Sequence, residues 1–374
     1  MMEQKRLGDI ATYINGFAFK PEDRSTVGLP IIRIQDLTGN AYDLGFYDGS
    51  YPKRIEINDG DVLISWSASL GVYVWNRGKA LLNQHIFKVA FDKCDVNREF
   101  FVYAVRHKLK EMESKTHGAT MKHIVKKDFD NTLIPFPTLN EQGKIAKLLD
   151  TAATIISARQ QQLQKLDELV KARFVELFGD PISNPKGWKK DKAESHIDLL
   201  SGYPFQSEQY VNDGINICGG LIIMPQKIQW QDCRHWPSVD GYEDYLLDED
   251  DIVMALDRPW ISEGFKIAQV DSTHLPALLI QRTARIRGID VNQQYLFHCF
   301  VNGGFDKHSN VTGSLVPHIS AKDIRSFEIL LPPIKLQKQF AAFVKQVDKS
   351  KVAVQKALDE AQLLFDSLMQ KYFE

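Results

Sequence analysis

Residues 136–155 read FPTLNEQGKIAKLLDTAATI, and residues 331–350, which lie 195 positions later, read LPPIKLQKQFAAFVKQVDKS. The two stretches are copies of one segment, because identical residues recur at this offset without a gap. An internal repeat of this kind constrains the whole fold before any local structure is assigned. The identities at an offset of 195 are Gly118 with Gly313, Ile124 with Ile319, Asp128 with Asp323, Pro137 with Pro332, Gln142 with Gln337, and Ala146 with Ala341.

The register of the repeat drifts farther upstream. Gly16 matches Gly202 at an offset of 186, and residues 61–63 match residues 251–253 at an offset of 190. Loops of different length would produce such a drift. We therefore expect two halves that share a framework and differ in their loops.

Residues 141–178 have the pattern of one long helix. They contain no Gly after Gly143 and no Pro, and a seam of mostly apolar residues advances by alternating steps of four and three. Such a heptad pattern is typical of a helix that packs along another helix. The seam recurs 195 positions later, so we expect two register-matched helices that pair with each other. The first seam is Ile145, Leu149, Ala152, Ile156, Arg159, Leu163, Leu166, Val170, Arg173 and Leu177, and the second is Phe340, Val344, Val347, Lys351, Val354, Leu358, Ala361, Phe365, Leu368 and Tyr372.

Helix-start and helix-stop signals bound the first of these helices. Pro135 and Pro137 favour an extended approach, Thr138 and Glu141 form a possible capping box, and Gly179 can adopt the left-handed conformation that ends a helix. A helix of about 38 residues is roughly 57 Å long. This length favours a spacer that holds two bodies apart, with a dimerisation helix as the alternative.

The remaining chain forms two bodies in which short strand-like runs alternate with turn residues. We expect strands in residues 30–37, 59–67, 72–76 and 85–91 of the first body, and in 215–223, 250–256, 266–270 and 283–288 of the second. Residues 98–112 and 293–305 predict one short helix in each. The fold class is α+β, with a small curved sheet in each body. The expected segments are body 1–138, helix 139–178, connector 179–186, body 187–333 and helix 334–374.

Bulk composition fits a globular protein of more than one domain. The chain has 374 residues, 44% hydrophobic and 25% charged, and a formal net charge of −2. It has no apolar run of membrane-spanning length and no signal-peptide core, and its four cysteines include no C-x-x-C pair, so we expect a cytoplasmic protein without structural zinc. Residues 105–127 carry seven Lys or Arg and two Glu, which predicts either a binding patch or a solvated helix face.

The common catalytic motifs are absent from the sequence. It contains no phosphate-binding loop, no G-x-G-x-x-G, no H-E-x-x-H and no G-x-S-x-G, and the NPKG at 184–187 lacks the aromatic residue of a base-flipping methyltransferase motif. His123 and His318 differ by 195 positions, which indicates one polar role in both bodies, either structural or in contact with nucleic acid. We interpret as turn formers, rather than nuclease metal ligands, Asp59, Asp61, Asp248, Asp250 and Asp251.

These residues together identify a resemblance over essentially the whole chain. The stretches LFGDPISNPKGW, IPFPTLNEQGKIAKLL, ILLPPIKLQKQFAAFV, DGDVLISWSASLG and LLNQHIFKV resemble recurring elements of the DNA-specificity subunit of type I restriction-modification enzymes. The resemblance implies two target-recognition domains alternating with two long antiparallel helices. It departs from the family pattern at Thr138, which replaces a Pro, and at Leu336, which replaces a Glu.

The resemblance also implies a function. Each recognition domain would read one half of a bipartite, asymmetric site in double-stranded DNA, and the helices would set the gap and bind two methyltransferase subunits, with restriction subunits joining them. The subunit itself would be noncatalytic and would need no cofactor, metal or membrane. A coiled-coil scaffold or regulator whose bodies bind protein is the alternative.

Loops rather than the framework should read the bases, because Arg, Lys, Asn and Gln recognise base edges whereas phosphate contacts only position a protein. Each candidate has either a structural role or a DNA contact. The candidates are Trp66, Ser67, Gln84, His85, Lys122, His123 and Lys126 in the first body, and Arg258, Trp260, Gln281, Arg282, Ser314 and His318 in the second.

Overall fold

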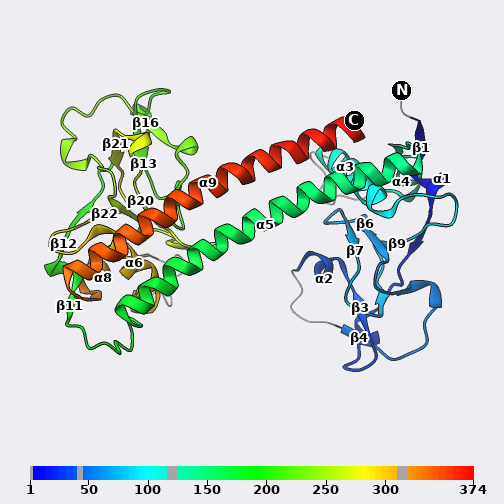
Figure 1. The fold of residues 1–374 in the computed structure, drawn as a ribbon, viewed down its shortest axis with the longest axis horizontal. Coiled ribbons are helices and arrows are strands. Elements are labelled where there is room, and N and C mark those ends of the chain that lie inside the picture. The colour runs from blue at the N-terminus through cyan, green and yellow to red at the C-terminus, as the bar shows by residue number, and fades with distance from the viewer. Residues whose placement is uncertain (1–2, 40–44, 116–123, 310–317) are drawn as a thin grey trace. The chain divides into compact units, whose positions relative to one another are not determined.

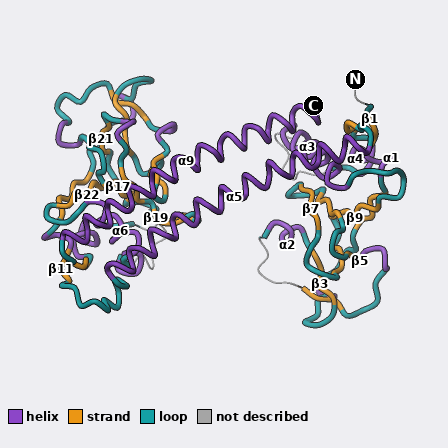
Figure 2. The backbone as a smooth tube through the Cα atoms, in the orientation of Figure 1, coloured by secondary structure: helices purple, strands orange, loops and turns teal. Residues whose placement is uncertain are grey.

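The computed structural model describes residues 3–39, 45–115, 124–309 and 318–374. Its backbone contacts divide the chain into two compact units, and each long helix contributes to both (Figures 1 and 2). The first unit comprises residues 1–160 and 356–374, and the second comprises residues 161–355. Each unit combines small sheets with helices, so the α+β class is confirmed.

The first unit contains two four-stranded sheets, ordered β2-β9-β6-β7 and β4-β3-β8-β5, and the antiparallel pair β1-β10. Strands β3 and β8 run parallel and the other pairs are antiparallel. The strands are β1 (Gln4–Arg6), β2 (Thr12–Asn15), β3 (Leu29–Ile32), β4 (Gly45–Tyr47), β5 (Glu56–Ile57), β6 (Val62–Ser65), β7 (Gly71–Val74), β8 (Ala80–Leu82), β9 (Ile86–Ala90) and β10 (Leu133–Pro135). The helices are α1 (Leu7–Ile10), α2 (Ile34–Thr38), α3 (Arg98–Lys115) and α4 (Lys126–Asp130), with parts of α5 (Leu139–Phe178) and α9 (Ile334–Phe373).

The second unit repeats this arrangement. Its main sheet has the order β12-β22-β17-β20, and a second sheet has the order β16-β13-β21 with β13 and β21 parallel. Two short hairpins, β14-β15 and β18-β19, and the long-range antiparallel pair β11-β23 complete it. The strands are β11 (Lys190–Lys192), β12 (Ile197–Ser201), β13 (Ile215–Cys218), β14 (Ile223–Met224), β15 (Lys227–Ile228), β16 (Arg234–Trp236), β17 (Ile252–Ala255), β18 (Trp260–Ile261), β19 (Gly264–Phe265), β20 (Ile267–Gln269), β21 (Ala277–Leu279), β22 (Thr283–Gly288) and β23 (Glu328–Leu330). The helices are α6 (Gln293–Asn302), α7 (Phe305–His308) and α8 (Ala321–Ser326).

The strand orders place the two copies in register. The order β2-β9-β6-β7 corresponds to β12-β22-β17-β20, and β4-β3-β8 corresponds to β16-β13-β21. The pairs β1-β10 and β11-β23 close the two units in the same way. The repeat found in the sequence is therefore a repeat of topology.

One predicted strand is only half correct. Residues 30–37 form β3 as far as Ile32, and the chain then turns into helix α2. The Asp36 carboxylate accepts the Arg33 N–H at 2.8 Å and the Arg33 Nε–H at 3.0 Å, and both side chains are buried. This buried pair fixes a helix start at a position where the apolar alternation alone predicts continued strand. In the second copy, the predicted strand 215–223 is interrupted: β13 ends at Cys218, and Ile223 begins the next short strand, β14.

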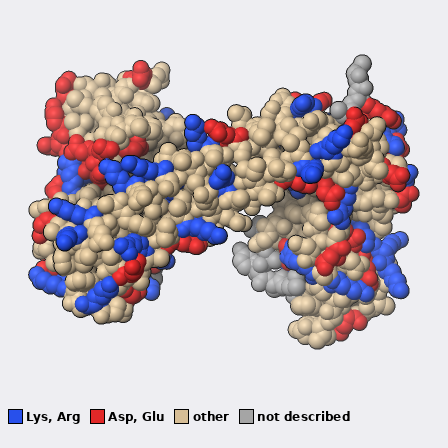
Figure 3. Space-filling model, in the orientation of Figure 1, with Lys and Arg blue, Asp and Glu red and all other residues tan. Residues whose placement is uncertain are grey.

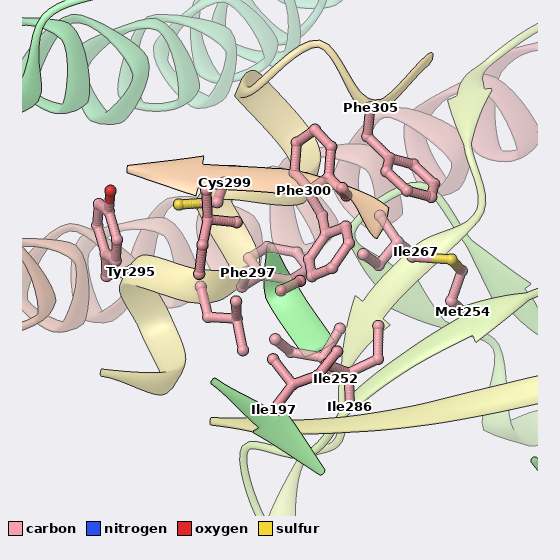
Figure 4. Packing of buried hydrophobic residues seen from close by; sticks show 14 of the residues in the cluster. Ile197, Ile252, Met254, Ile267, Ile286, Tyr295, Phe297, Cys299, Phe300 and Phe305 are labelled. Atoms are coloured by element: carbon pink, nitrogen blue, oxygen red, sulfur yellow. The ribbon is translucent and has the colours of Figure 1, made fainter. Parts of the chain in front are cut away.

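The core of each unit lies between the main sheet and its helices. In the second unit, residues of β12, β17, β20 and β22 pack against the aromatic face of α6 (Figure 4). The same core includes Phe174 of α5 and Phe340 of α9, whose rings lie 5.5 Å apart. In the first unit, Phe100 of α3 and Phe373 of α9 have ring centroids 5.3 Å apart.

Helices α5 and α9 pair in opposite directions. The first part of α5 shares a core with the last part of α9 in the first unit, and the last part of α5 shares a core with the first part of α9 in the second. Lys351 Nζ of α9 also lies 2.6 Å from Asp167 Oδ1 of α5. The predicted antiparallel pairing is therefore confirmed within each unit.

The predicted helix signals are also observed. Thr138 N–H and its hydroxyl donate to Glu141 Oε2 at 3.1 and 2.8 Å, which completes the capping box of α5. Gly179 has a φ of +82° and donates its N–H to Val175 O at 2.7 Å, so it ends α5 in the left-handed conformation.

Each long helix is also tied to its unit by a buried glutamine. Gln142 donates to Pro137 O at 2.9 Å and accepts from Asn97 N at 2.9 Å. Gln337 donates to Pro332 O at 2.8 Å and accepts from Asn292 N at 2.8 Å. The glutamine that is identical in the two copies of the repeat therefore makes the same contact in both units. It links the start of the long helix to the residue that precedes α3 in the first unit and α6 in the second.

Candidate nucleic-acid interface

Three segments meet at one end of the main sheet of the second unit. They are the turn after β17, the turn between β21 and β22, and the segment that precedes α8. Leu256 lies between the other two, because its N–H donates to Arg282 O at 2.9 Å and its carbonyl accepts from Ile319 N at 2.8 Å. Backbone hydrogen bonds therefore fix the relative positions of all three segments.

The Asp257 carboxylate joins two of the predicted base-reading side chains at this place. Its Oδ2 accepts from Arg282 Nη1 at 2.9 Å, and its Oδ1 lies 2.6 Å from His318 Nδ1. The side chain of Arg282 is 74% exposed and that of His318 is 54% exposed. Arg258, the next residue of the turn, is also exposed. The arrangement presents cationic and hydrogen-bonding groups to solvent from a fixed base.

The first unit builds the same junction with different side chains. Trp66 N–H donates to His85 O at 3.2 Å, and Trp66 O accepts from Ile124 N at 3.0 Å. The Trp66 ring stacks on Phe87, with centroids 5.5 Å apart, and meets the edge of His85 at 4.9 Å. This aromatic stack replaces the polar contacts that Asp257 makes in the second unit. Ser67 occupies the position of Asp257, at the offset of 190.

The turns that carry these residues share an uncommon backbone conformation. Ala68 and Arg258 have φ values of +59° and +45°, and His85 and Arg282 have φ values of +70° and +62°. Residues with side chains rarely adopt this left-handed region, and such positions concentrate at functional sites. Both copies retain it at two equivalent places, although the residues differ. The backbone shape is therefore the constant part of the junction, and the side chains are its variable part.

A glycine in each copy makes room for the second of these turns. The N–H of Gln84 donates to Phe17 O at 2.9 Å, and the N–H of Gln281 donates to Tyr203 O at 2.8 Å. A Cβ atom on Gly16 would lie 1.9 Å from a carbonyl oxygen of the first turn. A Cβ atom on Gly202 would lie 2.0 Å from a carbonyl oxygen of the second. The matched glycines noted in the sequence thus allow the strand to approach the turn closely.

The remaining candidates have mixed outcomes. Lys126 begins α4, pairs with Asp130 at 2.8 Å, and has its ammonium 5.9 Å from the Phe87 ring, so it lies close to the junction. Trp260 stacks on Phe265 with centroids 4.9 Å apart at the edge of the core. Trp260 is partly exposed. Outside the described residues lie Lys122, His123 and Ser314.

The prediction overlooked Asp257, which organises the junction of the second unit. The sequence did contain a signal for it, because Asp257 lies 190 positions after Ser67, a residue that was selected. An acidic residue does not itself attract DNA, and a search for cations and amides therefore passes over it. Its role is visible only once Arg282 and His318 are seen on either side of it.

The other charges near the sheet have structural partners. Arg285 pairs with Asp198 at 2.8 Å, and Arg287 lies 2.5 and 2.7 Å from the two oxygens of Asp251. The hydrogen bonds and charge of Asp251 raise the pKa of Arg287 despite its partial burial. These contacts tie Arg285 and Arg287 to the framework, whereas the Arg282 side chain is 74% exposed beside Asp257.

Two of the five acidic residues, Asp61 and Asp251, accept a turn N–H with their side chains, as predicted. Asp61 Oδ2 accepts from Asn58 N at 2.8 Å, and Asp251 Oδ2 accepts from Asp248 N at 2.7 Å. Within residues 3–39, 45–115, 124–309 and 318–374, no group of three or more His, Cys, Asp and Glu side chains is placed to hold a metal ion. In the same ranges no helix is long and apolar enough to cross a membrane.

Two cations of the basic stretch of residues 105–127 have partners within the first unit. Lys108 pairs with Glu111 at 2.9 Å, and the Arg106 guanidinium lies 5.7 Å from the Tyr103 ring centroid. On the face shown in Figure 3, cationic and anionic side chains are interspersed on each unit. The exposed groups at the junction of the second unit, Arg258, Arg282 and His318, are local features suited to nucleic acid.

Comparisons with known proteins concern the family and the repeated fold. The model of the type I restriction modification DNA specificity domain matches residues 1–168 and 238–361. The MjaVIII specificity subunit of Methanocaldococcus jannaschii is 26% identical over 314 residues, which cover 79% of this chain and 74% of that protein. The EcoBI specificity subunit of Escherichia coli is 30% identical over 168 residues, which cover 44% of this chain and 35% of that protein.

The fold comparison extends over the whole chain. The crystal structure of the type I restriction-modification S subunit from M. genitalium matches with a TM-score of 0.58 at 14% identity, covering 100% of this chain and 96% of that one. At this identity the likeness concerns the fold. The family match covers most of the chain and includes residues of both repeats, and the chain therefore belongs to the type I restriction modification DNA specificity domain family.

Proposed function

We propose that this chain is the DNA sequence-specificity subunit of a type I restriction-modification system. The observation that carries the proposal is the duplicated junction. Two copies of one framework present turns of the same backbone shape and different side chains, Trp66 and His85 in one and Asp257, Arg282 and His318 in the other. A reader of an asymmetric, bipartite sequence needs this combination, because each half-site must meet its own set of side chains.

The proposed division of labour follows the repeat. Residues 1–138 and 187–333 would be the two target-recognition domains, and residues 139–178 and 334–374, joined through the connector 179–186, would set the gap between half-sites. The core contacts between α5 and α9 in each unit support this role for the helices.

The proposed partners are double-stranded DNA, two methyltransferase subunits and restriction subunits. The chain would act without catalysis of its own. The near-neutral net charge of −2 is compatible with DNA binding in a complex, because partner subunits can supply phosphate contacts.

The test begins with methylation mapping in cells that carry this chain together with its methyltransferase. We expect modified bases in one split sequence with a constant gap. The purified complex should bind that sequence in preference to one with either half scrambled. A complex without sequence preference would refute the proposal and would favour a scaffold whose bodies bind protein.

A further inference from the structure

A third turn lies beside each junction and was not among the predicted reading segments. In the second unit, β13 ends at Cys218, whose carbonyl accepts from Ile280 N at 3.2 Å. Ile280 directly precedes the Gln281–Arg282 turn, so the residues after Cys218 lie next to that turn. A Cβ atom on Gly220 would lie 3.9 Å from Arg282 O, which confirms the proximity.

This third turn exposes one large apolar side chain. The N–H groups of Ile222 and Ile223 both donate to Gly219 O, at 3.1 and 3.3 Å, and close a tight turn. Ile222 and Ile223 are 4% and 0% exposed, whereas Leu221 between them and the glycines is 91% exposed. A leucine held almost wholly in water gives up the stabilisation that burial would provide. Its place in the turn therefore suits a contact with something outside the chain.

The turn is held in place from below by a buried cation. The Lys266 ammonium donates to Gly220 O, and Lys266 is only 6% exposed. Burial lowers the pKa of this lysine. Its backbone N–H also donates to Pro259 O at 2.7 Å, which links the third turn to the turn that carries Arg258. Leu221 is thus presented by a fixed scaffold next to the junction.

The first unit has the same turn with a polar side chain at its tip. The N–H groups of Asp36 and Leu37 both donate to Arg33 O, at 3.0 and 3.3 Å. Gln35 is exposed and lies 186 positions before Leu221, the offset that also relates Gly16 to Gly202. The Arg33–Asp36 pair anchors this turn, as Lys266 anchors the other. Both copies therefore hold one exposed side chain at the same point.

We infer that Leu221 and Gln35 are base-contacting residues, the third reading position of each unit. The inference rests on the proposed function and names the chemistry of the contact. An apolar side chain beside cationic groups suits the 5-methyl group of a thymine in the major groove, and a glutamine suits the N6 and N7 edge of an adenine. The two half-sites would accordingly differ at this position.

The test uses the complete complex of this chain with its methyltransferase and the target found by methylation mapping. Each thymine of the target is replaced in turn by deoxyuridine, which removes only the methyl group. We expect wild-type binding to weaken about fourfold at one thymine, the equivalent of one lost methyl contact. Leu221→Ala should bind the intact target about fourfold more weakly and should be insensitive to that replacement.

A matched control separates this effect from a general loss of apolar surface. Ile289 is 68% exposed and follows β22, whereas the junction lies before that strand, so the two ends are roughly 20 Å apart. Ile289→Ala should behave as wild type. Unchanged melting temperatures of both variants would show that folding is intact.

Three results would overturn the inference. In the first, deoxyuridine replacement at any thymine leaves the affinity of the wild-type complex unchanged. In the second, the Leu221→Ala complex loses as much affinity as wild type at every replaced thymine. In the third, Leu221→Ala weakens binding equally on all sequences. In each of these the intact target is still preferred over scrambled DNA, so the proposed function stands. Loss of that preference in the wild-type complex would instead refute the proposed function, and the inference with it.

Discussion

Replacement of the buried glutamines by leucine should destabilise one unit at a time. Gln142→Leu keeps the volume of the side chain but removes both its hydrogen bonds, and leaves the Pro137 carbonyl and the Asn97 N–H without this partner. The side chain of Gln142 is 1% exposed, so water cannot readily take its place. Gln337→Leu should do the same to Pro332 in the second unit.

The magnitude follows from the burial of the groups that are left unpaired. An unsatisfied buried carbonyl costs about 1–3 kcal/mol, and the loss of the half-buried N–H bond adds about 0.5–1.5 kcal/mol. The sum is about 1.5–4.5 kcal/mol, which lowers the melting temperature of a unit of this size by about 3–18 °C.

Calorimetry gives the melting temperature, and hydrogen–deuterium exchange locates the loss. Gln142→Leu should reduce protection at residues 97–105 and 139–150, and Gln337→Leu at residues 292–302 and 334–345. Gln161→Leu, an exposed change on α5, is the control and should shift neither measurement. A Gln142→Leu chain with wild-type melting and exchange would refute the reasoning, as would equal loss in both units from a single substitution.

Three further outcomes are expected. Arg282→Ala should reduce discrimination at one base pair of one half-site by about 1–3 kcal/mol, measured by competition binding. The control Lys190→Ala should not change base preference. If Arg282→Ala weakened binding equally on all sequences, a base-reading role for Arg282 would be contradicted. Burial, with the nearby Lys351 charge, lowers the pKa of His298 from 6.5 to about 3. As the pH falls below 6.5, this histidine is therefore protonated in the unfolded chain before it is protonated in the folded one. The free energy of unfolding of the second unit, measured by urea titration, should fall by about 3 kcal/mol between pH 7 and 4. His298→Leu should abolish this pH dependence. Deletion of one heptad from α5 alone should disrupt its pairing with α9 and abolish specific DNA binding. Deletion of the equivalent heptad from both helices should instead shorten the preferred gap between half-sites by about three base pairs. An unchanged gap would show that the helices do not set it.

The overall organisation was readable from the sequence because its signals are local or repeated. A heptad seam needs only the identities of residues along one helix, and the offset of 195 positions needs only two copies of one chain. The Thr138 capping box and the Gly179 helix end are likewise short-range, and both are observed. The run at residues 30–37 was misjudged because the buried Arg33–Asp36 pair, rather than the apolar alternation, decides where β3 ends.

The candidate site could be predicted only in part. Gln84, His85, Gln281 and Arg282 were selected for their side-chain types, and the structure places their turns at equivalent junctions. Trp260 was selected on the same basis, but it stacks on Phe265 at the edge of the core. Residue type alone does not distinguish a side chain that faces solvent from one that completes a core.

The sequence by itself determined that this protein has two copies of one framework and two register-matched helices, because periodicity and repetition are properties of the linear chain. Only the tertiary structure decided which side chains meet. Asp257, Arg282 and His318 come together because the end of β17, the start of β22 and the segment before α8 meet at one place, although up to 61 residues separate them in the sequence. In Leu221-Ile222-Ile223, three apolar neighbours look alike in sequence, and the turn at Gly219 exposes one and buries two. Long-range strand pairing sets that difference, and with it the surface that can meet DNA.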